Sequence, residues 1–145
     1  MLDAMGPHTR FQPVLPDPAK EDGARRIILC TGKVYYDLIA ERTRQSRDDI
    51  AIIRIEQLYP FPHHALMEQL VRHPDAEQVL WCQEEPQNNG AWIFVDRRIE
   101  RALRGCKHRA QRPDYAGRES TASPATGLPG VHAAQQEKLV QDALS

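Results

Sequence analysis

A chain of 145 residues has room for one domain with a real hydrophobic core, and a second full domain would be a tight fit. Hydrophobic residues make up 41% of the chain and charged residues 27%, which is typical of soluble globular proteins. The formal net charge is -1 with both signs interspersed, so the chain lacks the broad basic surface that binds a nucleic-acid backbone.

Cysteine usage and apolar runs bear on the compartment. Cys30, Cys82 and Cys106 form no CxxC pair, which indicates a reduced, intracellular chain with buried thiols. The longest apolar runs are far shorter than the ~20 residues of a membrane span. The first residues, MLDAMGPHTR, lack a secretion signal. We expect a cytoplasmic protein without a membrane partner; a mitochondrial origin with a removed presequence stays open.

Residues 1–23 are predicted to form an extended N-terminal arm, followed by an α/β domain over residues 24–145. The arm contains four prolines and little periodicity, which disfavours regular structure. Phe11, Val14 and Leu15 are apolar and need a surface to lie on. Either the arm packs against a neighbour that this chain lacks, or it is an unstructured terminus.

The first half of the domain alternates strand and helix. Arg26–Cys30 and residues 49–55 are short apolar runs, as expected of strands buried on both faces. Residues 34–43 carry an apolar stripe at helical spacing. Prolines within residues 57–62 exclude strand and helix, and a helix is predicted from His63 until His73-Pro74 stops it.

The second half continues this alternation. Its predicted elements are, in order, a strand at 78–82, a polar loop at 83–90, a helix starting at Trp92, a short strand at 114–117, a loop at 119–130 and a closing helix at 131–144. Such alternation predicts an α/β fold of three αβα layers around a mostly parallel sheet of about four or five strands. Loops beginning at Thr31, Glu56 and Gln83 should then meet at the carboxyl edge, where ligands of such sheets bind.

Three cations near that edge are candidate ligand residues. Lys33 follows Gly32 in a strand-to-helix turn that suits an anion, although the phosphate-loop motif is absent and the alternative is a tight turn with a solvated lysine. Arg54 interrupts an apolar strand, so it pairs with Glu56 or Glu84 or faces an anionic ligand. Arg118 leaves the same two alternatives.

Catalytic and metal motifs are weak. Glu84 and Glu85 are adjacent in an extended segment, so they point in different directions and need not form an acid/base pair. The histidines match no metal-binding spacing, and no serine lies in a GxSxG context. We therefore predict no catalytic residue and no metal ligand in this chain.

Four motifs in order resemble one family. CTGKVYYDL (30–38) resembles the CSGKVYYDL stretch of 2-oxoglutarate dehydrogenase, and RIEQLYPFP (54–62) is similar to its RIEQLYPFP. WCQEEPQNNGAW (81–92) resembles WCQEEPxNxGAW, and residues 115–127 resemble YAGRxxxASPAxG. The resemblance covers about residues 11–144; Thr31 replaces a serine, and residues 106–112 form a slightly longer loop.

The resemblance implies a fold like the C-terminal domain of transketolases. The family reaction is oxidative decarboxylation of 2-oxoglutarate in the tricarboxylic acid cycle, with succinyl transfer to a lipoyl group. Thiamine diphosphate and magnesium would be held by preceding domains, and this chain would bind neither. The domain would support a homodimer, and in some members a nucleotide or acetyl-CoA binds at or near it.

Lys33, Arg54 and Arg118 lie on the matched motifs, so we expect them to form an effector site for AMP or acetyl-CoA, unless they are structural ion pairs. The leading hypothesis is a structural and regulatory domain, inactive alone, with an exposed apolar patch for the catalytic domains. One alternative is a free-standing nucleotide-binding sensor, and another is a small enzyme that uses Glu84 and Glu85.

Overall fold

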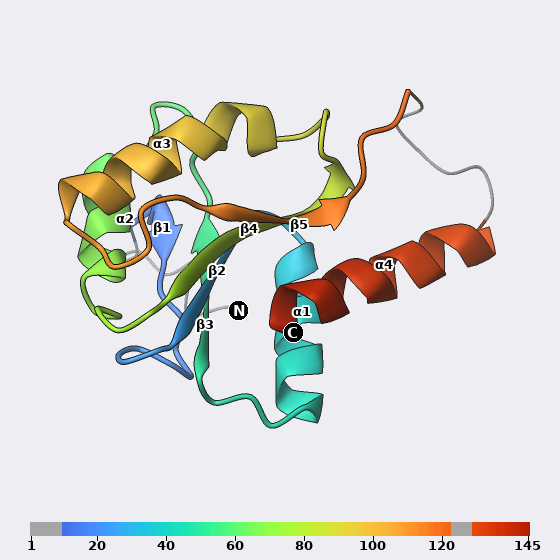
Figure 1. Cartoon of the computed structure of the whole chain (residues 1–145), viewed down its shortest axis with the longest axis horizontal. Helices are drawn as coiled ribbons and strands as arrows, with labels where there is room; N and C mark the ends of the chain where they lie inside the picture. Colours follow the sequence, from blue (N-terminus) through green and yellow to red (C-terminus); the bar gives the residue numbers. More distant parts are fainter. Residues whose placement is uncertain (1–9, 123–128) are drawn as a thin grey trace.

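A computed structural model describes residues 10–122 and 129–145 (Figure 1). Predictions for residues 1–9 and for 123–128, including part of the last motif, lie outside the described residues. The elements are, in chain order, β1 (Val14–Leu15), β2 (Arg26–Cys30), α1 (Val34–Arg44), β3 (Ile50–Ile55), α2 (His63–Leu70), β4 (Gln78–Pro86), α3 (Trp92–Gly105), β5 (Asp114–Arg118) and α4 (Pro129–Leu144).

The strands form one sheet in the order β1-β3-β2-β4-β5. β2 pairs in parallel with both β3 and β4, and β4 pairs in parallel with β5. Only β1, within the described residues, is antiparallel. Parallel neighbours require crossover helices, which α1, α2 and α3 supply. The predicted α/β fold with a mostly parallel sheet is confirmed.

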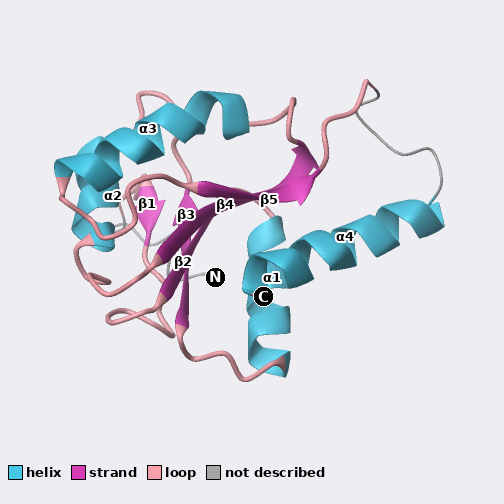
Figure 2. Ribbon diagram, viewed as in Figure 1, coloured by secondary structure: helices cyan, strands magenta, loops and turns pink. Residues whose placement is uncertain are grey.

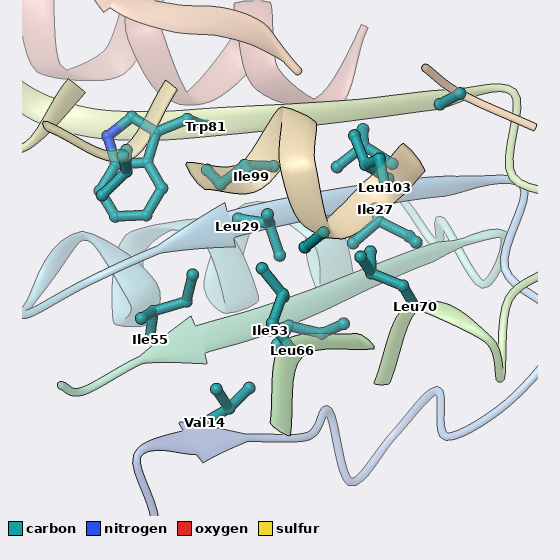
Figure 3. Close-up of a cluster of buried hydrophobic side chains, with 14 of the residues drawn as sticks. Val14, Ile27, Leu29, Ile53, Ile55, Leu66, Leu70, Trp81, Ile99 and Leu103 are labelled. Atoms are coloured by element: carbon teal, nitrogen blue, oxygen red, sulfur yellow. The ribbon is translucent and has the colours of Figure 1, made fainter. Parts of the chain in front are cut away.

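Helices α2 and α3 cover one face of the sheet and α1 and α4 cover the other (Figure 2), and a hydrophobic core lies on each face. Odd-numbered residues of β2, such as Ile27 and Leu29, pack with Trp81 against α2 and α3 (Figure 3). Even-numbered residues, such as Ile28, pack against α1 and α4. This alternation follows from the period of two along a strand, and it makes the molecule three layers thick.

The arm is not separate from the domain over its described part. β1 adds to the sheet edge, with Val14 paired to Ile55 and almost fully buried. Farther along, the buried Asp17 carboxylate accepts the Ile52 amide at 2.8 Å. The arm therefore lies on its own domain, while Phe11 remains 70% exposed.

β4 is longer than the sequence suggested. Residues 83–86, expected in a polar loop, continue the strand, and Pro86 pairs with Arg118 of β5 across an irregularity in the register. The prediction of a loop was wrong because it took the polar residues as solvated, whereas the Gln83 amide is buried and hydrogen-bonded within the protein. Among the described residues, no helix is both long and apolar enough to cross a membrane.

Candidate functional site

The parallel strands carry their following loops to one edge of the sheet. Because β2, β3 and β4 run in the same direction, their carboxyl ends lie side by side. A cavity of about 450 Å³ at this edge is lined by Thr31, Tyr59, Gln83 and Glu85, among others. Residues from all three predicted loops thus meet, as the topology required.

Lys33 lies at the start of α1, immediately after a sharp turn. Gly32 has a φ of +71°, a conformation that disfavours residues with a Cβ. The exposed Lys33 ammonium lies 3.4 Å from a carboxylate oxygen of Glu84 on β4. A charge so open to water contributes little to stability, so it stays available to a ligand.

Arg54 has structural partners on the α1 side of the sheet. Its guanidinium lies 4.3 Å from the centre of the Tyr35 ring, and its Nε is 3.7 Å from Glu56. Glu56 is one of the acids that the sequence proposed for it. The arginine is thus partly neutralised and stacked, which explains how an apolar strand tolerates it.

Arg118 ends β5 and reaches helix α4. Its Nη2 lies 3.2 Å from His132 Nε2 and 3.5 Å from Gln136 Oε1. Its Nε is buried and has no hydrogen-bond partner among the described residues. An unmet buried donor of this kind is costly, and an anion reaching it would remove that cost.

Gln136 joins two of the three predicted cations. Its amide donates to Glu84 at 3.0 Å and to Asp37 at 2.9 Å, while its oxygen faces Arg118. Lys33 and Arg118 therefore belong to one network, with two carboxylates balancing two cations. Among the described residues, no hydrogen bond or ion pair links Arg54 to this network. No local pattern pointed to Gln136, because α4 reaches this place from far along the chain.

A buried amide fixes the loop that follows β4. Gln83 Oε1 accepts the Trp81 indole N–H and the Trp92 backbone N–H, both at 2.9 Å. Its Nε2 donates to three backbone carbonyls, including Asn89 O at 2.8 Å. Gly90, at a φ of +65°, turns the chain towards α3. One side chain that lines the cavity therefore joins β4, the loop after it and the start of α3 by hydrogen bonds.

The Tyr115 side chain of β5 reaches the carboxyl ends of β4 and β5. Its hydroxyl lies 2.8 Å from Arg118 O and 3.2 Å from Glu85 O. Burial raises the pKa of Tyr115 to about 12, so the hydroxyl stays protonated and donates. The ends of β4 and β5, where Arg118 projects, are therefore fixed in place.

Glu84 and Glu85 lie on opposite sides of β4, so they do not form an acid/base pair with each other. Glu84 faces α1 and α4, whereas Glu85 lines the cavity on the other side of β4. Burial raises the pKa of the Cys82 thiol to about 12 and that of Cys30 in the same direction, so both stay protonated. No cluster of three or more His, Cys, Asp or Glu side chains in the described segments has the geometry of a metal site. The described residues therefore do not fit the magnesium ion of a thiamine diphosphate site.

A family model described as "2-oxoglutarate dehydrogenase C-terminal" matches residues 1–144. The chain belongs to this family. The E1 component of 2-oxoglutarate dehydrogenase from Azotobacter vinelandii is 48% identical over 140 residues, covering 93% of this chain and 14% of the relative. That from Brucella anthropi is 51% identical over 125 residues, covering 86% and 12%.

This member of the 2-oxoglutarate dehydrogenase C-terminal family thus spans about one seventh of the Azotobacter relative. Its fold is similar to a solved structure described as "Split gene transketolase, inactive beta4 tetramer", with a TM-score of 0.59 and 14% identity, over 96% of this chain and 43% of that one. The resemblance to a transketolase C-terminal domain is confirmed at the level of the fold.

Proposed function

We propose that this chain is the structural and regulatory C-terminal domain of a 2-oxoglutarate dehydrogenase E1 component and is not catalytic alone. The catalytic domains would hold thiamine diphosphate and magnesium, oxidatively decarboxylate 2-oxoglutarate and transfer the succinyl group to lipoyl. This domain would pack against those catalytic domains and stabilise the homodimer. A cytoplasmic location is part of the same proposal. Its main support is that relatives of high identity are about seven times longer.

An exposed apolar rim supports the docking of catalytic domains. We define this rim as the exposed Tyr59 and Ile93 together with Leu58 and Phe94, which are half-buried; Leu58, Tyr59 and Phe94 line the carboxyl-edge cavity. Tyr59 is 83% exposed and Ile93 68% exposed, although both are large apolar side chains. Exposed apolar side chains that adjoin a cavity are typical of interaction surfaces.

The docking role is tested with an E1 relative that lacks its last domain. This chain, thiamine diphosphate, magnesium, 2-oxoglutarate and a redox dye are added. We expect no turnover by the chain alone and restored turnover with both parts. Tyr59→Ser should weaken their association about tenfold, since an interface aromatic contributes more than 1 kcal/mol. The control is Val71→Ser, which changes an exposed apolar residue directly after α2; this variant should not weaken the association. Turnover by the chain alone, or equal association of both variants, would contradict the proposal.

The cations suggest a regulatory anion site. Lys33 and Arg118 share one network, and Arg118 retains the buried unpartnered Nε, so the phosphate of AMP or acetyl-CoA would gain charge-assisted hydrogen bonds there. Arg54 would contribute only by leaving Glu56. Such an anion must compete with Glu84 and Asp37, which predicts modest affinity.

The effector role is tested by titrating AMP and acetyl-CoA into the assembled enzyme. Lys33→Ala and Arg118→Ala should weaken binding about tenfold each, given about 1.5–3 kcal/mol for a hydrogen bond to a charged group. Lys138→Ala, an exposed lysine of α4, is the control. The absence of binding at millimolar ligand would leave these cations as structural ion pairs. Tight binding to the isolated chain would instead favour a free-standing sensor.

A further inference from the structure

A groove separate from the carboxyl-edge cavity opens between the arm, α2 and α3. Its volume is about 630 Å³ and its lining is mostly apolar. We define its floor as Phe61, Pro62 and Met67, and its rim as His63, His64 and Arg101. Met67 lies against Gly105 of α3, where a Cβ would come within 3.3 Å of Met67 Cε, so the missing side chain leaves room for the thioether between the two helices.

Helix α3 beside this groove, together with the segment that follows it, carries an excess of positive charge. Residues 96–112 contain seven cations and two carboxylates, although the whole chain has a net charge of -1. Glu100 pairs with Arg97 and Arg104, Asp96 with Arg112, and Glu77 with Arg109. Among the described residues, no carboxylate lies within ion-pair distance of three of the seven cations, namely Arg98, Arg101 and Lys107. Two of these, Arg98 and Arg101, lie close enough to the groove for their charges to influence His63 on its rim.

The field at the groove is positive. Burial lowers the pKa of His63, and the positive charges of Arg101, Arg98 and His64 lower it further. No carboxylate is among the groups that act on His63. Arg98 is already engaged, with its guanidinium 3.6 Å from the Phe94 ring centre. Arg101 lies on the rim and is exposed. Within the described part of the chain, its guanidinium has no hydrogen-bond or ion-pair partner, so its N–H groups can bind a ligand.

We propose that this groove binds an acidic segment of another polypeptide, whose apolar side chains contact the floor and whose carboxylates pair with Arg101 and the two rim histidines. The groove is open along one side, which suits an extended peptide. A small ligand bound there would leave more of its surface exposed to water than it would in a typical small-molecule pocket. Charge complementarity selects an acidic segment over a neutral or basic one. This inference does not depend on the proposed function.

The test uses a short fluorescein-labelled peptide that alternates glutamate with leucine. The control peptide replaces each glutamate with glutamine. We expect saturable binding of the acidic peptide alone, weakened by added salt because the contact is electrostatic. Arg101→Gln should weaken binding about tenfold, which corresponds to about 1.4 kcal/mol. Arg109→Gln, which removes an arginine paired with Glu77, should leave binding unchanged.

A second readout separates docking from a structural role of Arg101. A carboxylate beside His63 favours its protonated form, so the pKa of this imidazole, followed by NMR, should rise in the complex. Equal binding of the two peptides, an unaffected Arg101→Gln variant, or an unchanged His63 titration would overturn the proposal. Inorganic phosphate that saturates the site and displaces the peptide would assign the groove to a small anion and overturn it too.

Discussion

At the scale of single residues, the most consequential contact is a buried ion pair between the arm and α1. Arg42 is 7% exposed and pairs with Asp17, which is 1% exposed. Arg42 also donates to Ile50 O at 3.0 Å, and Asp17 accepts the Ile52 amide. One pair therefore ties the arm, α1 and β3 together.

Asp17→Ala should lower the free energy of unfolding by about 3–5 kcal/mol, because Arg42 would stay buried without its counter-charge. Urea denaturation measures this change. Asp22→Ala removes a carboxylate that pairs with Arg72 at an exposed position, and it should have a much smaller effect. Similar losses in the two variants would show that burial of the Asp17 pair is not what stabilises the arm.

A second residue, His73, makes stability depend on pH. Its ring is 1% exposed, and its Nδ1 accepts the Ala24 N–H at 3.0 Å, so this nitrogen must be unprotonated. Burial lowers the pKa of His73, Arg72 and Lys20 lower it further, and Asp22 and Asp17 oppose them. In the unfolded chain the ring binds a proton at the ordinary pKa of 6.5. The unfolded state therefore binds more protons between the two pKa values.

The contribution of His73 to stability should be complete above pH 6.5 and should be lost as the pH falls towards its lower folded pKa. Urea denaturation between neutral and mildly acidic pH measures this slope. His73→Gln should reduce the slope without abolishing it, because the pKa of His63 is lowered as well. His64→Gln, at an exposed position, should retain it. An identical slope in wild type and His73→Gln would refute this origin of the acid sensitivity.

At the scale of elements, the joint end of β4 and β5 depends on a glycine. A Cβ at Gly117 would overlap the Tyr115 hydroxyl and lie 3.0 Å from Gln83 O. Gly117→Ala should therefore lower the free energy of unfolding by about 1–3 kcal/mol, as overpacking does. Gly130→Ala, in open space on α4, should be neutral or stabilising because alanine favours helix. Thermal denaturation compares the two; a neutral Gly117→Ala would mean that this strand end yields.

Patterns within short stretches of sequence predicted most of these elements correctly. Helices α1 to α4 and the apolar strands β2 and β3 follow from the spacing of apolar residues and from proline stops. The predictions were wrong or incomplete for β4 and β1. Residues 83–86 are polar, and β1 is only two residues long, so both depend on a partner strand distant in sequence. Pairing between distant segments leaves little trace in a local window.

At the scale of the whole molecule, the same limit applies to the candidate site. The sequence placed Lys33, Arg54 and Arg118 at one sheet edge, because strand direction alone brings their loops there. It did not predict that Gln136 would link Lys33 to Arg118 through Glu84, or that Arg54 would stack on Tyr35. Those contacts depend on how α1 and α4 pack on the sheet. The effector role of the three cations stays a prediction.

The strand order has a spectroscopic consequence. β1 and β5 are the two outermost strands and are separated by four interstrand spacings, or about 19 Å at about 4.8 Å each. Spin labels on these strands would report that separation by electron paramagnetic resonance, whatever the surrounding helices do. A broadened distance distribution in a larger assembly would thus signal detachment of an outer strand, whereas rigid movement of the whole unit would leave it unchanged.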